Sequence, residues 1–124
     1  MMIVELVFEG EFPTLNKVIA LSKDHYGSYS RVKKEYTEMI HWECKKYPRP
    51  PTLTKPVKIS FVWHRKDRRH DPDNVMVGSK FILDGLVKAK VLQGDGWRHI
   101  VELNHGFRLD KKNPRVEVRL EEVE

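Results

Sequence analysis

The sequence predicts an α+β domain, with a mixed sheet of about four strands and two main helices packed on it. Segments with strand-like alternation and segments with helical spacing follow one another in the order strand, helix, strand, helix, strand, strand. The 124 residues suffice for a single domain, 1–124, with one modest core. Apolar runs stay well below the roughly 18 residues that a membrane-spanning helix needs.

The first part of the chain predicts one strand, one turn and one helix. Residues 2–8 alternate weakly, as a strand does, and Phe12–Asn16 contains a proline and predicts a turn. Apolar residues then recur at three- and four-residue spacing from about Ser30 to Lys46, which predicts a helix. These residues are Val32, Tyr36, Met39 and Ile40. The proline-rich segment Tyr47–Pro51 cannot continue a helix and is expected to end it.

The second part predicts a half-buried strand, a helix and two closing strands. In this strand, Val57, Ile59, Phe61 and Trp63 alternate with Lys58, Ser60, Val62 and His64. A polar segment, Arg65–Asn74, separates this strand from a helical pattern that extends to about Lys90. The apolar face of that helix comprises Val75, Ile82, Leu83, Leu86 and Ala89. After a turn at Gln93–Gly96, two strands near His99–Leu109 and Arg115–Val123 are expected to form a closing hairpin across residues 110–114.

The positive charge of the chain is concentrated in its middle. Lysine and arginine total 23 against 18 acidic residues, a net charge of +5. Residues 55–90 hold nine basic and four acidic residues, so this window alone carries the whole excess of +5. Such a patch suits a polyanionic partner, although a charged solvated loop has the same composition. The single Cys44 can form neither an internal disulfide nor a cysteine-based zinc site, which favours a reducing cytoplasm.

Two carboxylates, Asp71 and Asp73, lie two residues apart inside the basic segment. Pro72 favours an extended backbone at Asp71, and alternate side chains of an extended chain share a face. Paired carboxylates repel each other unless a cation lies between them, and hard oxygen ligands suit Mg2+ or Mn2+. The alternative is ordinary loop and cap chemistry, in which Asp73 or Asn74 caps the second helix.

Two further features complete the set of candidate residues. Asp95 lies between two glycines after the second helix and is either a third metal ligand or a simple turn residue. Lys80 and Asp84 are four residues apart on one helix face, where the alternative to a functional role is a surface salt bridge of little energy.

Taken together, these residues resemble the RusA family of Holliday-junction resolvases. The family pattern is a basic run, then Asp-x-Asp-Asn, a helix carrying Lys and Leu-Asp-x-Leu, and a turn with a final Asp. The matching segments are Arg68–Asn74, Lys80–Leu86 and Gly94-Asp95, with an early Pro-x-x-Asn at Pro13 and Asn16. The lysine lies further from the second Asp here than in the familiar form, and Gly94 stands where the family often has another aspartate.

The resemblance implies a small dimeric nuclease, dependent on Mg2+ or Mn2+, that nicks four-way DNA junctions symmetrically in recombination and repair. It assigns metal binding and catalysis to Asp71, Asp73 and Asp95, and catalysis less firmly to Lys80. It also implies a cytoplasmic protein encoded by a bacterium or a phage.

The basic residues of this segment are expected to hold DNA phosphates near the metal. These are Arg65, Lys66, Arg68 and Arg69, with Asn74 beside them. Two rival interpretations stay open: a catalytically silent module that binds junctions or single strands, and an interaction domain without nucleic acid. The silent module leaves three aspartates in a positive patch unexplained.

Overall fold

The computed structural model describes residues 2–46 and 48–123. In that part of the chain, the elements follow one another in the order β1, α1, α2, β2, α3, α4, β3, β4. Their bounds are β1 Ile3–Glu9, α1 Leu15–Lys23, α2 Ser28–Lys45, β2 Val57–Arg65, α3 Pro72–Met76, α4 Ser79–Lys88, β3 Ile100–Leu109 and β4 Arg115–Glu122.

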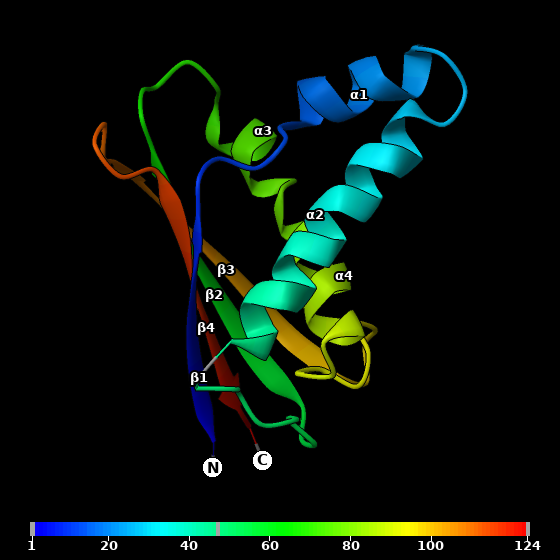
Figure 1. Ribbon diagram of the computed structural model, residues 1–124. Coiled ribbons are helices and arrows are strands. Elements are labelled where there is room, and N and C mark those ends of the chain that lie inside the picture. The colour runs from blue at the N-terminus through cyan, green and yellow to red at the C-terminus, as the bar shows by residue number, and fades with distance from the viewer. Residues whose placement is uncertain (1, 47, 124) are drawn as a thin grey trace.

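The strands form one mixed sheet in the order β1-β4-β2-β3. β4 runs antiparallel to both β1 and β2, whereas β2 and β3 run parallel. Helices α2 and α4 lie against one face of the sheet, and the N- and C-terminal ends meet at the same end of it (Figure 1). The predicted α+β class with a four-stranded mixed sheet is confirmed.

β2 is the central buried strand of this sheet. Its side chains alternate regularly between buried and half-buried, as the sequence predicts. The buried set faces the helices and includes Ile59, Phe61 and Trp63, each at most 1% exposed. The strand therefore holds the middle of the core while its two edges are hydrogen-bonded to β4 and β3.

The predicted closing hairpin is wrong, because β3 and β4 are not neighbours. β2 lies between them, and β4 inserts between β1 and β2. The segment from the end of β2 through α3 and α4 is a crossover connection, and a crossover of this kind returns the chain parallel to the strand that it left. β3 therefore pairs parallel with β2 on the outer side, and residues 110–114 pass over the end of β2 to reach β4.

The predicted turn at Phe12–Asn16 is also wrong in its second half, because a helix begins there. Thr14 is the N-cap of α1, and its Oγ1 accepts a hydrogen bond from the Lys17 amide at 3.3 Å. Pro13, interpreted as a turn residue, immediately precedes the cap, a place where proline does not interfere with helical hydrogen bonds. No α1 residue is buried, so burial gives no periodic signal for this helix.

The predicted second helix is two helices that are separated by Val77 and Gly78. A Cβ atom on Gly78 would lie 2.8 Å from Phe12 Cβ and 3.1 Å from the Trp63 ring. The chain passes so close to Trp63 at this point that a side chain does not fit. The break places the short α3 over the end of β2 and lets α4 start in a new direction.

The first predicted helix is confirmed as α2, which begins at Ser28, two residues before the expected start. Gly27 precedes it with a φ of 89°, a conformation that glycine adopts without strain. The proline-rich segment that was expected to end it includes Tyr47, which lies outside the described residues. Lys46 is the C-cap, and its amide donates to the Glu43 carbonyl.

The contact between α2 and α4 depends on a residue without a side chain, Gly85. A Cβ atom there would lie 2.3 Å from Ile40 Cβ and 2.4 Å from Ile40 Cγ2. Ile40 is fully buried, so it has no free space to move into. The close approach therefore fixes the position of α4, and with it Lys80 and Asp84.

We expect Gly85→Ala to destabilise the protein, although alanine is the better helix former. Overpacking costs roughly 1–3 kcal/mol, which exceeds the helix-propensity gain of about 1 kcal/mol at most. Urea denaturation measures the free energy of unfolding. Gly96→Ala is the matched control, because a Cβ at Gly96 meets nothing within 4 Å. Equal stability of the Gly85→Ala variant and the parent would contradict the tight contact.

Candidate active site

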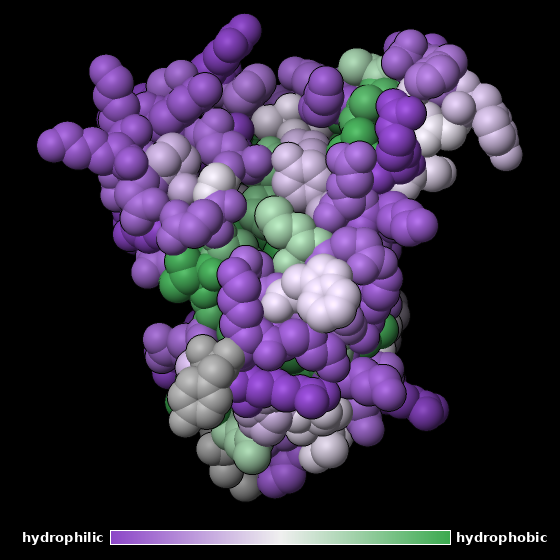
Figure 2. Space-filling model, viewed as in Figure 1, coloured by the Kyte–Doolittle hydropathy of each residue, from purple (hydrophilic) through white to green (hydrophobic). Residues whose placement is uncertain are grey.

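The segment between β2 and α3, residues 66–70, is named here the basic loop. β2 and β3 are parallel and end together, with Arg65 opposite Leu109, so the loop starts beside the end of β3. Lys66, Arg68 and Arg69 are exposed. The loop projects at the upper left of the molecule, next to the connection between β3 and β4 (Figure 1), and hydrophilic side chains cover this end (Figure 2).

Arg65 differs from the other basic residues of the segment because it is only 9% exposed. Its Nε lies 3.4 Å from Glu11 Oε2, and its Nη1 donates to the Phe12 carbonyl at 3.5 Å. The same Glu11 carboxylate accepts a hydrogen bond from the Lys66 amide at 2.9 Å. A buried guanidinium needs such partners. Arg65 thus ties the start of the basic loop to the segment before α1.

A hollow of about 630 Å³ opens beside the basic loop, and we name it the Asp71 hollow. It is lined by Arg65, Asp67, Arg68, His70, Asp71, Pro72, Val75, Phe107, Arg108 and Leu109. Its lining therefore combines carboxylates with three arginines from two strands and a loop. Arg108 was not among the residues expected from sequence; it reaches the hollow because β3 runs parallel to β2.

Asp71 and Asp73 lie at the start of α3. Asp71 is the N-cap residue, but its side chain makes no cap hydrogen bond, and it is exposed. Asp73 is in the first turn, and its Oδ1 accepts from the Asn74 amide at 3.0 Å. The cap alternative is thus not realised by Asp73 or Asn74. Asp71 has the extended backbone that Pro72 favours, whereas Asp73 belongs to the helix α3. The segment from Asp71 to Asp73 is therefore not extended along its whole length, contrary to what the sequence led us to expect.

A second group of charged residues gathers at the start of α4. Lys80 Nζ donates to Asp84 Oδ1 at 3.2 Å and lies 4.0 Å from Asp95 Oδ2. Asp84 Oδ2 lies 3.4 Å from Lys33 Nζ, which comes from α2. The structure therefore brings Lys80 and Asp84 together, as their four-residue spacing on one helix face predicts, and places Asp95 beside them. Lys33 was not expected, because nothing in the sequence indicates which face of α2 meets α4.

The pKa of Lys80 is raised, chiefly by the hydrogen bond to the Asp84 carboxylate. The negative charges of Asp84 and Asp95 raise it further, while partial burial opposes them. Lys80 is consequently a firmly protonated cation at neutral pH. A fixed ammonium group beside Asp95 can stabilise negative charge but cannot accept a proton.

The described ranges, 2–46 and 48–123, contain no group of three or more acidic, histidine or cysteine side chains placed to hold a metal ion. Asp71, Asp73 and Asp95 are thus not gathered into one ready ligand cluster. The donor atoms are still oxygens, which suit Mg2+. This ion typically takes one or two carboxylates and completes its coordination with waters and substrate phosphates. The aspartate oxygens therefore fit Mg2+, provided that waters and substrate phosphates supply the remaining ligands.

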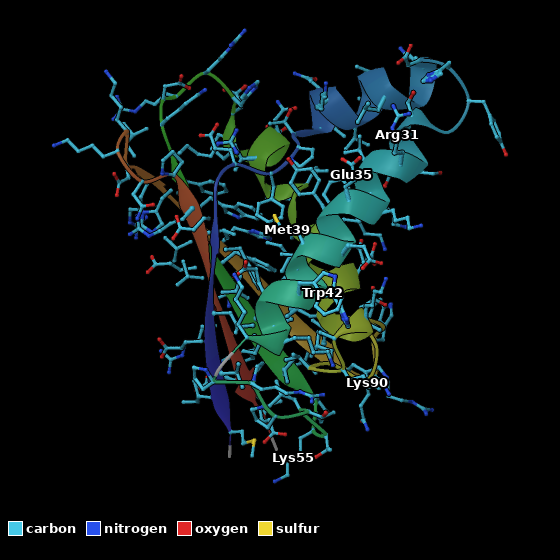
Figure 3. All side chains as sticks on the ribbon, viewed as in Figure 1. Arg31, Glu35, Met39, Trp42, Lys55 and Lys90 are labelled. Atoms are coloured by element: carbon cyan, nitrogen blue, oxygen red, sulfur yellow. The ribbon has the colours of Figure 1, made fainter. Side chains whose placement is uncertain are left out.

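A larger, open hollow of about 830 Å³ lies on the other side of the basic loop. Asn16 and Pro13, the early family-like residues, line it together with Arg69, Tyr36 and Glu35. Glu35 lies on the half of α2 nearer to α1 (Figure 3). The hollow explains why residues near the N-terminus and residues after β2 recur in one sequence pattern, since the fold places them around the same space.

Exposed arginines around a carboxylate suit contact with the phosphates of a nucleic acid, because arginine side chains bind phosphate oxygens. A family model described as endodeoxyribonuclease RusA matches residues 14–121. The chain belongs to the RusA family of endodeoxyribonucleases, which are Holliday-junction resolvases of DNA recombination. No curated protein matches the chain. In the described part of the chain, no helix has the length and apolarity to cross a membrane.

We expect Asp84→Asn to lower the pKa of Lys80, because it weakens the hydrogen bond that is the largest cause of the raised value and removes the negative charge that adds to it. Asp95→Asn should lower it less, since Asp95 acts at longer range. An NMR titration of the Lys80 side chain measures both. The matched control is Asp67→Asn, which removes a carboxylate of the basic loop that is bonded to the Arg69 amide. A larger decrease in the control than in Asp84→Asn would contradict the assignment.

Proposed function

We propose that this protein is a metal-dependent endonuclease that resolves four-way DNA junctions by symmetric nicking. The observation that carries the proposal is the Asp71 hollow, in which an exposed carboxylate without a cap hydrogen bond lies among arginines. Arginines without a metal ligand would suffice for binding DNA. A carboxylate in the same hollow repels phosphate, so it would weaken DNA binding unless it binds a metal ion.

The exposed basic side chains of the loop would hold the DNA backbone. Lys66, Arg68 and Arg69 project into solvent and can each reach a phosphate, and Arg108 adds a fourth cation at the hollow. Arg65 is buried and paired, so its contribution is to hold the loop in place. Asn74 is half-buried beside Asp73, and we propose that its side-chain amide meets DNA or the metal hydration shell.

Mg2+, or Mn2+ in its place, would be held by Asp71 and Asp73 together with Asp95. When bound, it would activate a water and relieve charge on the phosphate. Because fewer than three ligands are gathered among the described residues of the free protein, waters and a DNA phosphate would complete the coordination. The residues of the chain then act as orienting groups: the basic loop places the phosphate, and the carboxylates define where the cation sits.

Lys80 would stabilise the negative charge that develops during cleavage. Its raised pKa keeps it cationic, and Asp84 holds its ammonium group close to Asp95. Asp84 is itself fixed by Lys33 of α2. Lys80 thus contacts two acidic residues, Asp84 and Asp95. Its separation from Asp73 along the sequence is longer than in the familiar family pattern, and we propose that these two contacts still hold its ammonium group in place for catalysis.

Symmetric nicking of a junction requires two active sites, and one chain provides one. A homodimer with two-fold symmetry is the simplest way to obtain them. The second candidate function is a junction-binding module without cleavage. It is favoured by the lack of a three-ligand cluster in the described residues. Incubation of a synthetic four-way junction with and without Mg2+, beside a linear duplex, separates the two.

The Asp→Asn variants of Asp71, Asp73 and Asp95 should each abolish Mg2+-dependent cleavage. The substitution preserves size but removes the charge that attracts a hard cation. Junction affinity without metal should hold or increase, because repulsion of phosphate falls. Stability should change by no more than about 0.5 kcal/mol, as is usual for surface positions. Cleavage, affinity and melting temperature are measured side by side.

Asp67→Asn is the control for these variants, because Asp67 also lines the hollow but is bonded within the loop. It should retain cleavage. Full cleavage by any of the three variants removes that residue from the metal site. Full cleavage by all three, or no cleavage by the parent protein, ends the nuclease proposal in favour of the binding module.

Replacing Arg68 and Arg69 by alanine should weaken binding to all junction sequences alike, since phosphate contacts carry no sequence information. The slope of log affinity against log salt should fall by roughly one unit per lost contact. Lys34→Ala, on the exposed side of α2, is the control and should leave the slope unchanged. An unaltered slope in the arginine variant would place DNA elsewhere on the surface.

A further inference from the structure

Trp97 is the most exposed of the three tryptophans, and the rest of the protein does not cover its side chain. It is 99% exposed, whereas Trp63 is 1% exposed and belongs to the core. Trp42, on α2, is intermediate at 62%. Folding normally covers much of a tryptophan, because its large ring buries a large apolar area. The indole of Trp97 contributes nothing to the core, and both faces of its ring are open to a ligand.

The turn that carries Trp97 is anchored at both ends. Before the turn, the Leu53 amide donates to the Val91 carbonyl at 2.8 Å. After it, the Val57 amide donates to the His99 carbonyl, also at 2.8 Å. Both ends are thus hydrogen-bonded to the part of the chain that leads into β2.

The backbone within this turn is ordered as well. The Gly96 carbonyl accepts hydrogen bonds from the amides of His99 and Ile100, both at 3.0 Å. A Cβ atom on Gly94 would lie 2.6 Å from His99 Cδ2, so the imidazole ring packs directly against the backbone at the start of the turn. Trp97 is therefore presented by a closed turn, and a ligand that covers its ring does not have to order the backbone first.

The same turn also carries Asp95 of the candidate active site. Asp95, two residues before Trp97, has its Oδ2 atom 4.0 Å from the Lys80 ammonium nitrogen. Arg98, the residue after Trp97, is exposed and is a cation that can bind a phosphate. A ligand on the indole of Trp97 therefore lies close to the carboxylate and the lysine that are proposed above to act in cleavage.

The chemistry of the turn fits a nucleobase better than an apolar protein surface. The residues next to Trp97 are Asp95, Gly96, Arg98 and His99, which form no apolar patch around the ring. An indole stacks on the face of any base, and a neighbouring arginine suits the phosphate of the same nucleotide.

Stacking on a protein ring requires a base with an uncovered face. In a linear duplex each base is covered by its neighbours, and a protein reaches its face only at the cost of unstacking it. Four arms meet at the branch point of a four-way junction, and the continuous stack of a duplex is interrupted there. A stacking residue therefore gains affinity from a branched DNA that it does not gain from a linear one.

We propose that Trp97 stacks on a base at the branch point of a four-way DNA junction and thereby favours branched over linear DNA. Trp97 determines specificity in this role and takes no part in the hydrolysis itself. The inference rests on the proposed function in taking junction DNA as the ligand, but it requires neither a metal ion nor cleavage.

The test compares a synthetic four-way junction with a linear duplex in the absence of Mg2+. Trp97→Ala should weaken junction binding about tenfold or more and leave duplex binding unchanged. The slope of log affinity against log salt should stay the same, because stacking releases no counterions. Trp97→Phe keeps an aromatic ring and should retain most of the junction affinity. Trp42→Ala, which removes the exposed indole of α2, is the matched control and should bind both DNAs like the parent.

Tryptophan fluorescence gives a second measurement of the same contact. In a Trp42→Phe background, Trp97 is the one exposed tryptophan, since Trp63 is buried. The junction should quench its emission and protect it from acrylamide, whereas the linear duplex should do neither. Thermal melting by circular dichroism establishes that each variant is folded.

The proposal is overturned if Trp97→Ala binds the junction like the parent, or if its affinity for the duplex falls by the same factor. It is also overturned if Trp97→Phe is as weak as Trp97→Ala, if the junction leaves Trp97 open to acrylamide, or if the parent does not prefer the junction. These measurements need no cleavage. A parent that prefers the junction through Trp97 but never cuts it contradicts the nuclease proposal alone, and a parent that cuts it without this preference contradicts only the role of Trp97.

Discussion

The burial of β2 is the constraint on which the rest of this structure depends. Its side chains Ile59, Phe61 and Trp63 face the helices and are almost inaccessible to solvent, and its backbone is hydrogen-bonded on both sides. A strand held in this way cannot shift in register without exposing its core residues. The segment that leaves its end therefore starts from a fixed point, and that segment contains the basic loop and Asp71.

Two sets of contacts hold the basic loop and α3 in a fixed position relative to β2. Arg65, the last residue of β2, is buried and paired with Glu11, whose carboxylate also accepts from the Lys66 amide. Gly78, between α3 and α4, lies so close to Phe12 and Trp63 that a side chain there would clash with them. The loop between these two anchors carries its charges outward. A rigid base with exposed cations suits a surface that must bind a polyanion without first ordering itself.

The position of β3 connects the site with the edge of the sheet. Because β3 is parallel to β2, its end lies beside the basic loop and supplies Arg108 to the Asp71 hollow. The same strand is outermost and carries exposed apolar side chains. The parallel pairing of β3 with β2 thus supplies a basic residue to the hollow and leaves the outermost strand of the described sheet next to it.

The sequence by itself determined the fold class, the alternating strand β2, the helix α2 and the grouping of Lys80 with Asp84, because each depends on spacing within one segment. The family pattern also lay in the sequence, since it is a matter of residue order. Tertiary structure decided what depends on distant partners. A continuous helical pattern is divided at Val77 and Gly78, where Phe12 and Trp63 leave no room for a side chain on Gly78, and α1 forms where Pro13 suggested a turn. Arg65 is buried because Glu11 meets it, and Lys33 joins Asp84 because Gly85 lets α2 approach α4. The separation of β3 from β4 belongs to the same class, because strand order follows from which strands can share the core and not from their order along the chain.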